Sequence, residues 1–135
     1  MKKEKSCGVV VFLDDKVLIV KHNKGHYGLP KGHVEDGETE YDTAIREVKE
    51  ETNVDVEIIK GFRKVITYSP KENVMKDVVF FIGTAKTYNL KNQECEISRV
   101  EFYPIETAPD VITYDDERNL LIDAINYYKE SKSDD

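Results

Sequence analysis

The sequence contains few cysteines, no long apolar run and no excess of positive charge. Its two cysteines, Cys7 and Cys95, lack the close spacing of a metal site, so we expect two reduced thiols in a cytoplasmic protein. No segment approaches the roughly 18 apolar residues that a membrane-spanning helix requires. The 27 acidic residues outnumber the 20 basic ones, and the net charge of −7 argues against a general binder of nucleic acids or membrane surfaces.

The first residues superficially resemble a secretory signal peptide, but a β-strand is the better interpretation. A lysine-rich start precedes an apolar run from Cys7 to Leu13, but this run stops at Asp14 without a small-residue cleavage site. We therefore expect the run to form a first β-strand and the protein to be cytoplasmic.

Length and hydrophobic patterning predict one domain in which helices cover a sheet. The 135 residues suffice for a single core and contain no repeat or linker, so we expect one domain across residues 1–135, with a frayed polar tail from Glu130. The order strands, helix, strands, helix indicates an α/β or α+β fold. Strands are predicted at 7–13, 16–21, 54–68 (one or two strands interrupted at Gly61), 77–86 and 99–103; polar loops or turns at 22–30, 69–73 and 91–96; and helices at 39–52 and 117–128.

The first predicted helix has recognisable ends and one apolar side. Thr39 can cap its first turn, with Asp42 three residues later in a weak capping box. Asn53 tolerates the left-handed conformation that ends many helices. Four apolar residues recur at helical spacing and are expected to form the buried stripe: Tyr41, Ala44, Ile45 and Val48.

Three carboxylates, those of Glu47, Glu50 and Glu51, fall on one face of this helix. Like charges at this spacing cost about a few tenths of a kcal/mol per pair, so the cluster indicates a counterion. A divalent metal ion bound by hard oxygen ligands is the natural one. Helical projection places the cluster beside the apolar stripe, at the rim where helix and sheet meet. Arg46 stands four residues before Glu50 and can pair with it.

A loop with several glycines, from Pro30 to Gly37, leads directly into this helix. Such a loop lets the backbone approach a phosphate closely and delivers the ligand to the positive end of the helix dipole. A solvated, glutamate-rich surface helix would explain the carboxylates alone, but it would not explain the loop. Loop and cluster together predict phosphate chemistry assisted by a metal ion.

The run Gly32-x5-Glu38-x7-Arg46-Glu47-Val48-x-Glu50-Glu51 is followed by Val54. It resembles the Nudix box, and only Asn53 departs from the pattern, where the family has glycine. The resemblance implies an α/β/α sandwich with a mixed β-sheet between helices. It also implies hydrolysis of a nucleoside diphosphate linked to another group, with Mg²⁺ or Mn²⁺ as cofactor.

The same resemblance implies roles for individual residues. Arg46 would orient a glutamate, and Glu38 would brace the loop or add a contact outside the metal's direct ligands. Glu96 lies in the loop where related enzymes often carry a further metal-binding or base glutamate, and the nearby Glu94 is an alternative for that position. Whether Glu47, Glu51 or Glu96 activates the attacking water stays open. The metal ligands would be Glu47, Glu50 and Glu51, and the catalytic residues would be Glu47, Glu51, Arg46 and Glu96.

Residues 27–35 are similar to the segment that opens the box in the asymmetrically cleaving diadenosine tetraphosphate hydrolases. In that subfamily, Lys31 and His33 would contact the polyphosphate, and Lys76 would add a further contact. An exposed loop histidine without a ligand is the alternative interpretation of His33.

The adenine site is also implied by this subfamily. Phe80 stands at a position that is aromatic there, commonly tyrosine, and Tyr114 matches a second aromatic residue that would sandwich the base. The alternative interpretation of Phe80 is a core residue, since alternation along a strand buries half of its side chains.

The expected reaction is therefore attack of water on phosphorus, converting diadenosine tetraphosphate into ATP and AMP. The expected partner is a small nucleotide, without nucleic acid or membrane, and the protein is expected to be a monomer. One alternative is another Nudix substrate, such as a nucleoside triphosphate, a diphosphoinositol polyphosphate or an RNA end. The last two would call for a more basic surface. A non-catalytic nucleotide sensor is a further alternative.

Overall fold

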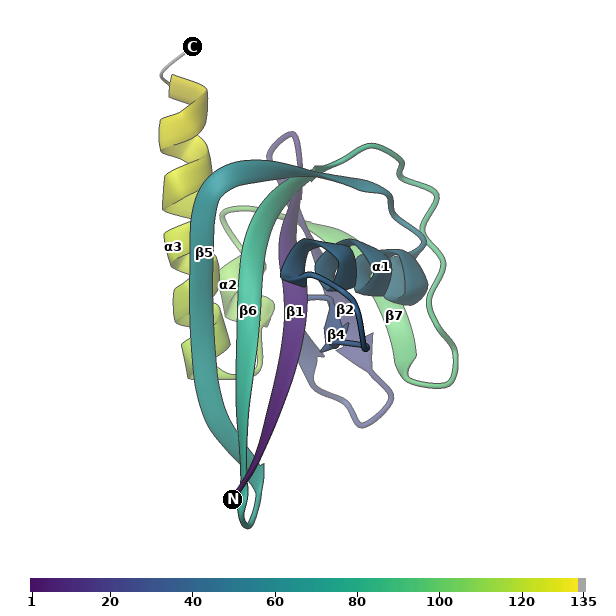
Figure 1. Cartoon of the computed structure of the whole chain (residues 1–135). Helices are drawn as coiled ribbons and strands as arrows, with labels where there is room; N and C mark the ends of the chain where they lie inside the picture. Colours follow the sequence, from purple (N-terminus) through teal and green to yellow (C-terminus); the bar gives the residue numbers. More distant parts are fainter. Residues whose placement is uncertain (134–135) are drawn as a thin grey trace.

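The computed structural model describes residues 1–133, in which a mixed β-sheet is covered by helices on both faces (Figure 1). No helix in this range is long and apolar enough to cross a membrane. The elements are β1 (Lys2–Leu13), β2 (Lys16–His22), β3 (Tyr27–Gly28), β4 (Lys31–His33), α1 (Glu40–Thr52), β5 (Val56–Lys71), β6 (Val74–Ala85), β7 (Ile97–Pro104), α2 (Ala108–Val111) and α3 (Asp115–Ser133).

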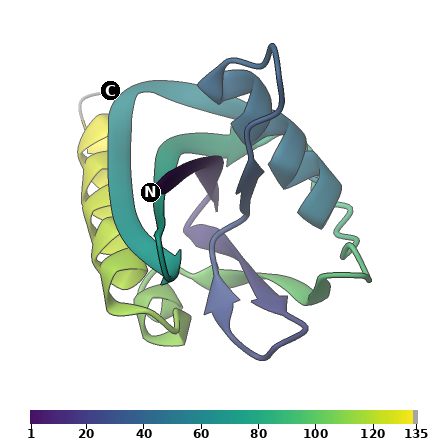
Figure 2. The same cartoon turned by 60° about the horizontal axis from the view of Figure 1, so that its bottom comes forward.

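The sheet is mixed because β1 pairs in parallel with β6, while its other pairings are antiparallel. The strand order is β3-β2-β1-β6-β5, with β4 paired to β1 and β7 paired to β2. The short β4 therefore pairs with β1, the central strand, and continues directly into the loop before α1. Figure 2 shows α1 and α3 on different sides of the strands. The α/β/α sandwich with a mixed sheet is confirmed.

Alternating residues of β1 fill two hydrophobic clusters, one on each face of the sheet. Val9 and Val11 belong to the cluster that includes Ala44 and Val48 of α1. Val10 and Phe12 belong to the other cluster, which includes α2 and α3. The Phe12 ring stacks on Tyr128 of α3 with 3.9 Å between ring centroids. Since α1 packs on one face of β1 and β4 pairs with its edge, the buried β1 determines where α1 and β4 meet.

The predicted ends of α1 are confirmed. The Thr39 hydroxyl accepts a hydrogen bond from the Asp42 N–H at 3.1 Å, and the Asp42 carboxylate accepts one from the Thr39 N–H at 3.2 Å. Asn53 ends the helix with a φ of 66°. Asparagine thus performs at this position the task for which glycine is the usual residue.

The predicted apolar stripe of α1 is only half correct. Ala44 and Val48 are fully buried, but Tyr41 and Ile45 are 42% and 40% exposed. The buried face is rotated toward the carboxylates, so that it includes Glu51. Tyr41 packs against the Phe81 ring at the edge of the interface, with 4.5 Å between centroids.

Several boundaries also differ from the prediction. The segment 54–68 forms one strand that extends to Lys71 and leaves only a short turn at Asn73, whose φ is 61°. The predicted loops at 22–30 and from Pro30 to Gly37 contain the short strands β3 and β4, and α2 was not predicted. The expected frayed tail is wrong up to Ser133, because α3 continues through it. Residues 134 and 135 lie outside the described part.

An ion cluster fastens the start of α1 to β1 and β5. The Glu40 carboxylate pairs with Lys5 Nζ at 2.5 Å and accepts hydrogen bonds from Arg63 at 2.8 and 2.9 Å. These bonds, with Arg63 the main contributor and Lys5 next, lower the pKa of Glu40 to about 2. Because this folded-state pKa lies below the ordinary value of 4.5, the stabilisation is present above about pH 4.5 and is lost as the pH falls toward 2.

We therefore expect Glu40→Gln to lower the free energy of unfolding by about 1 kcal/mol at pH 7. This deficit should shrink as the pH falls from 4.5 toward 2, because the wild-type carboxylate is then protonated as well. Urea titrations at a series of pH values measure it, with Glu72→Gln in an exposed turn as control. A deficit that stays constant down to pH 2.5 contradicts this interpretation of the cluster.

Candidate active site

The carboxylate of Glu47 lies against the backbone of β4. A Cβ atom placed on Gly32 would come within 1.5 Å of Glu47 Oε2. Only glycine therefore leaves room for this carboxylate between α1 and β4. The glycine of the predicted phosphate loop thus serves the packing of a candidate metal ligand.

Glu51 lies deeper than Glu47, between α1 and the sheet. Its side chain is 3% exposed, and its Oε1 accepts a hydrogen bond from the Lys31 N–H at 3.1 Å. Burial raises the pKa of Glu51 to about 8, and the charges of Glu47 and Glu96 contribute to this rise while Lys31 opposes it. A carboxyl group in this position is poorly compensated by the protein alone.

Arg46 joins the loop to the carboxylates of the helix. Its guanidinium donates hydrogen bonds to Glu38 at 2.6 and 2.9 Å, to Glu47 at 2.8 Å and to Glu50 at 3.1 Å. It also donates to the backbone oxygen of His33 at 3.0 Å. Glu38 in turn accepts from the Glu35 N–H at 3.0 Å. The hydrogen bonds from Arg46 are the main cause that lowers the pKa of Glu38 to about 2.

The three expected metal ligands lie together at the end of α1 but are not arranged around one point. Within residues 1–133, no three His, Cys, Asp or Glu side chains form a ready-made metal site. Arg46 Nη1 donates to both Glu47 Oε1 and Glu50 Oε2, whereas Glu51 Oε1 accepts from the Lys31 N–H of β4. Burial, followed by its contact with Glu50, raises the pKa of Glu47. Neighbouring carboxyls in a desolvated site, with free hard oxygens, fit a divalent cation such as Mg²⁺.

The other predicted residues of the phosphate site are spread around this cluster. Glu96 is exposed in the loop before β7, near enough for its charge to raise the pKa of Glu51. Lys76 is half-buried on β6, where burial and then the charge of Lys31 lower its pKa. His33 is exposed, with its Nδ1 3.4 Å from the Ser6 hydroxyl oxygen.

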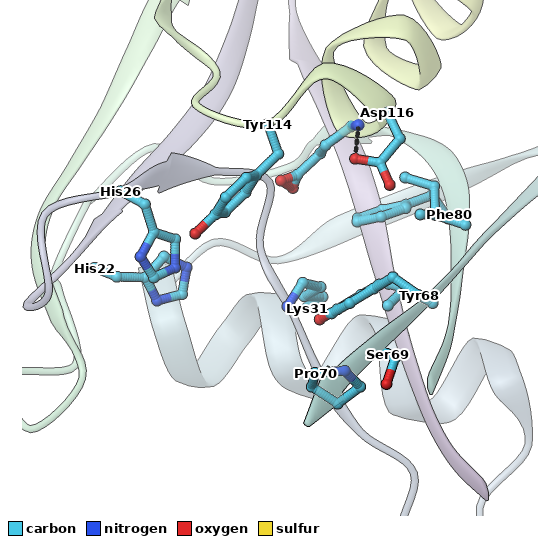
Figure 3. A pocket seen from close by; sticks show the side chains of 12 residues that line it. His22, His26, Lys31, Tyr68, Ser69, Pro70, Phe80, Tyr114 and Asp116 are labelled. Atoms are coloured by element: carbon cyan, nitrogen blue, oxygen red, sulfur yellow. Dashed lines mark hydrogen bonds between the residues drawn. The ribbon is translucent and has the colours of Figure 1, made fainter. Parts of the chain in front are cut away.

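A cavity of about 460 Å³ opens beside the carboxylate cluster (Figure 3). Lys31 connects the two, because its N–H binds Glu51 and it also lines the cavity. Of the two predicted adenine contacts, Phe80 is 1% exposed and lies in the core beneath the cavity, whereas Tyr114 is 55% exposed at its rim. Both interpretations of Phe80 are therefore compatible with its position. His33 and Lys76 do not line this cavity. Its walls are formed by His22, His26, Lys31, Ile66, Tyr68, Ser69, Pro70, Val78, Phe80, Tyr114, Asp116 and Glu117.

One end of the cavity is lined by aromatic rings. The rings of His22 and His26 stack with 4.1 Å between centroids, and His26 lies 5.7 Å from the Tyr114 ring. Burial, together with the charges of His26 and Lys31, lowers the pKa of His22 to about 4. Figure 3 shows both rings on the side of Tyr114 away from Phe80.

Sequence reasoning missed Tyr68, Glu117 and the two histidines. Tyr68 was expected at the end of a strand, and Glu117 at the start of a helix. Only the fold brings the end of β5 and the first turn of α3 to the same cavity. No local pattern in the sequence could have indicated this.

Comparisons with known proteins agree with this geometry. The chain is 31% identical over 102 residues to the bis(5'-nucleosyl)-tetraphosphatase [asymmetrical] of Mus musculus, covering 64% of this chain and 69% of that protein. It is 35% identical to the Sus scrofa protein of the same name, with the same coverage. A crystal structure of a C. elegans Ap4A hydrolase binary complex superimposes with a TM-score of 0.83 at 23% identity, covering 94% of this chain and 98% of the other. Residues 2–123 match the family model of the NUDIX domain, and the chain therefore belongs to the Nudix hydrolases.

Proposed function

We propose that this protein cleaves dinucleoside polyphosphates asymmetrically, converting diadenosine tetraphosphate into ATP and AMP. The observation that carries the proposal is the position of Lys31. Its N–H holds Glu51 in the carboxylate cluster, and its side chain lines the aromatic cavity. One extended ligand can therefore place a base in the cavity and its phosphates at the carboxylates. Two relatives more than 30% identical bear the name of this activity.

In this proposal the metal ligands are Glu47, Glu50 and Glu51. A bound Mg²⁺ or Mn²⁺ ion would neutralise phosphate charge and make a water molecule more acidic. Arg46 donates hydrogen bonds to Glu47 and Glu50, and it keeps Glu38 against the loop. Glu47, Glu51 and Glu96 are the candidates to accept the proton of the attacking water, and the charges of Glu47 and Glu96 both act on Glu51.

The phosphates are bound by the cations at the other side of the cluster. Lys31 and Lys76 lie close enough for the charge of Lys31 to lower the pKa of Lys76. A polyphosphate between the two ammonium groups would relieve this repulsion. His33, exposed on β4 close to Arg46, contributes a further donor. The base rests on Phe80 and is covered by Tyr114 from the rim.

Product analysis tests the proposal. Diadenosine tetraphosphate should yield equal amounts of ATP and AMP in the presence of Mg²⁺, and chelation of the metal should stop the reaction. Two molecules of ADP, or no ATP release at all, would overturn it. Faster release of pyrophosphate from ATP or GTP would favour the alternative of a nucleoside triphosphate substrate. One domain, a monomeric state and a cytoplasmic location stay predictions.

A further inference from the structure

Glu117 is a buried carboxylate that faces the cavity. It lies in the first turn of α3, is 8% exposed and lines the cavity. Its Oε2 accepts a hydrogen bond from the Leu29 N–H at 3.2 Å. A Cβ atom on Gly28 would lie 2.8 Å from Oε1. The carboxylate therefore packs closely over the backbone that leads from β3 to Lys31.

The second oxygen of Glu117 has no partner within residues 1–133. Only Oε2 takes part in a hydrogen bond. No fully buried side-chain nitrogen or oxygen in this range lacks a partner, so Oε1 must be open to the cavity that Glu117 lines. A carboxylate in such surroundings is costly unless each oxygen finds a donor. The unused oxygen is thus placed to accept a hydrogen bond from a ligand.

The groups around this oxygen determine which ligand part it meets. The charged groups that act on Glu117 are Lys31, on the phosphate side, and Asp116, the neighbouring residue on α3. Glu117 shares the cavity with the aromatic side chains of Phe80, Tyr68 and Tyr114. A planar base fits between such rings, but stacking discriminates poorly among bases. A single buried acceptor beside the rings supplies the discrimination that stacking lacks.

We propose that Glu117 selects the nucleobase: its Oε1 accepts a hydrogen bond from an N–H on the edge of the base, which in adenine is the 6-amino group. The inference rests on the proposed nucleotide substrate and adds its base preference. Adenine satisfies the oxygen through its amino group, whereas the same purine without that group leaves it unpaired. Glu117 is then a specificity-determining residue as well as the acceptor for Leu29.

Binding of two nucleotides that differ only in this group tests the inference. AMP and purine riboside 5′-monophosphate, which lacks the 6-amino group, are titrated into the protein by calorimetry. The wild-type protein should bind AMP roughly tenfold more tightly or better, as expected for a hydrogen bond to a charged group. Equal affinities in the wild type would overturn the inference without need of any variant.

The variant Glu117→Gln should abolish this preference. Because the amide oxygen must still accept the Leu29 N–H, the amide NH₂ turns to the cavity and meets the 6-amino group donor to donor. The ratio of the two dissociation constants should fall to about 1. The control Asp123→Asn removes the same charge from an exposed position of α3 outside the cavity and should keep the wild-type ratio.

A preserved ratio in a folded Glu117→Gln protein would overturn the inference and leave Glu117 as a positioning residue for Leu29. Since these titrations need no turnover, their outcome is separate from the proposed reaction. Cleavage of diadenosine tetraphosphate with an unaltered ratio refutes only the base selection. An adenine preference without cleavage refutes only the reaction.

Discussion

Substitution of Glu51 by Gln is expected to lower kcat on diadenosine tetraphosphate by at least about 100-fold, the usual cost of losing one preorganised charge-stabilising group. The amide keeps the volume of the side chain and can still accept the Lys31 N–H, which Glu51 accepts at 3.1 Å. What it loses is the negative charge that a divalent cation requires. The loss should therefore appear in turnover and metal affinity, and the fold should survive.

Two measurements separate this outcome from simple unfolding. The metal-free variant should unfold at a temperature no lower than the wild type, because the amide carries no charge to be buried at a site that is only 3% exposed. In the wild type, added Mg²⁺ should raise this temperature, and the rise should be smaller in the variant. The control Glu57→Gln changes an exposed residue of β5 and should alter neither quantity.

The result also decides between an enzyme and a nucleotide sensor built on the same fold. A sensor would show no turnover in the wild type, so that Glu51→Gln has nothing to remove. Wild-type kcat in the variant would instead mean that Glu51 takes no part in the reaction. In that case the buried Glu51 side chain would serve only to accept the hydrogen bond from Lys31 of β4.

The ends and the chemical character of α1 could be predicted because they depend on neighbouring residues. Thr39 and Asp42 form the capping box, and Asn53 adopts the left-handed conformation that a helix end needs. Such signals act over one turn and require no knowledge of the rest of the chain. The fold class followed in the same way from the order of strands and helices.

The orientation of α1 could not be predicted from its own apolar residues. Tyr41 and Ile45 extend the apolar stripe in sequence, yet both are about two-fifths exposed, and Glu51 is buried in their place. Where the helix rests is decided by β4, whose Lys31 N–H needs an acceptor and whose Gly32 admits the Glu47 side chain. Tertiary contacts overrode the hydrophobic pattern where the candidate site is built.

The candidate site was predictable to the extent that it lies in one stretch of sequence. The residues from Glu38 to Glu51 could be recognised from their spacing in the sequence. In the structure, Arg46 joins them through hydrogen bonds to Glu38 and Glu47. The cavity, in contrast, joins the end of β5 with the start of α3. Tyr68 and Glu117 gave no signal, because burial alone distinguishes Glu117 from its acidic neighbours.

Gly32→Ala is expected to have the second large effect, because it adds one methyl group at the closest contact of the site. The new Cβ would stand 1.5 Å from Glu47 Oε2. Gly32 has no positive φ, so alanine suits its backbone conformation and the cost is purely steric. The backbone of β4 cannot simply retreat, since Gly32 is paired with Cys7 of β1.

The carboxylate of Glu47 must therefore leave its place beside Arg46, which donates to it at 2.8 Å. We expect a loss of about 1–3 kcal/mol in the free energy of unfolding, as for other overpacked sites. Since a displaced ligand no longer meets the metal, kcat should fall by about 100-fold or more.

A double-mutant cycle with Glu47→Ala tests the steric origin of this effect. Removing the Glu47 side chain beyond Cβ eliminates the three atoms that the new methyl group would meet. Gly32→Ala should then cost almost nothing in stability, so that the two substitutions are strongly non-additive in urea titrations. If the costs simply add, the added methyl group destabilises the protein through a contact other than Glu47. The cycle thus tests whether the space beside Gly32 is needed for the Glu47 carboxylate.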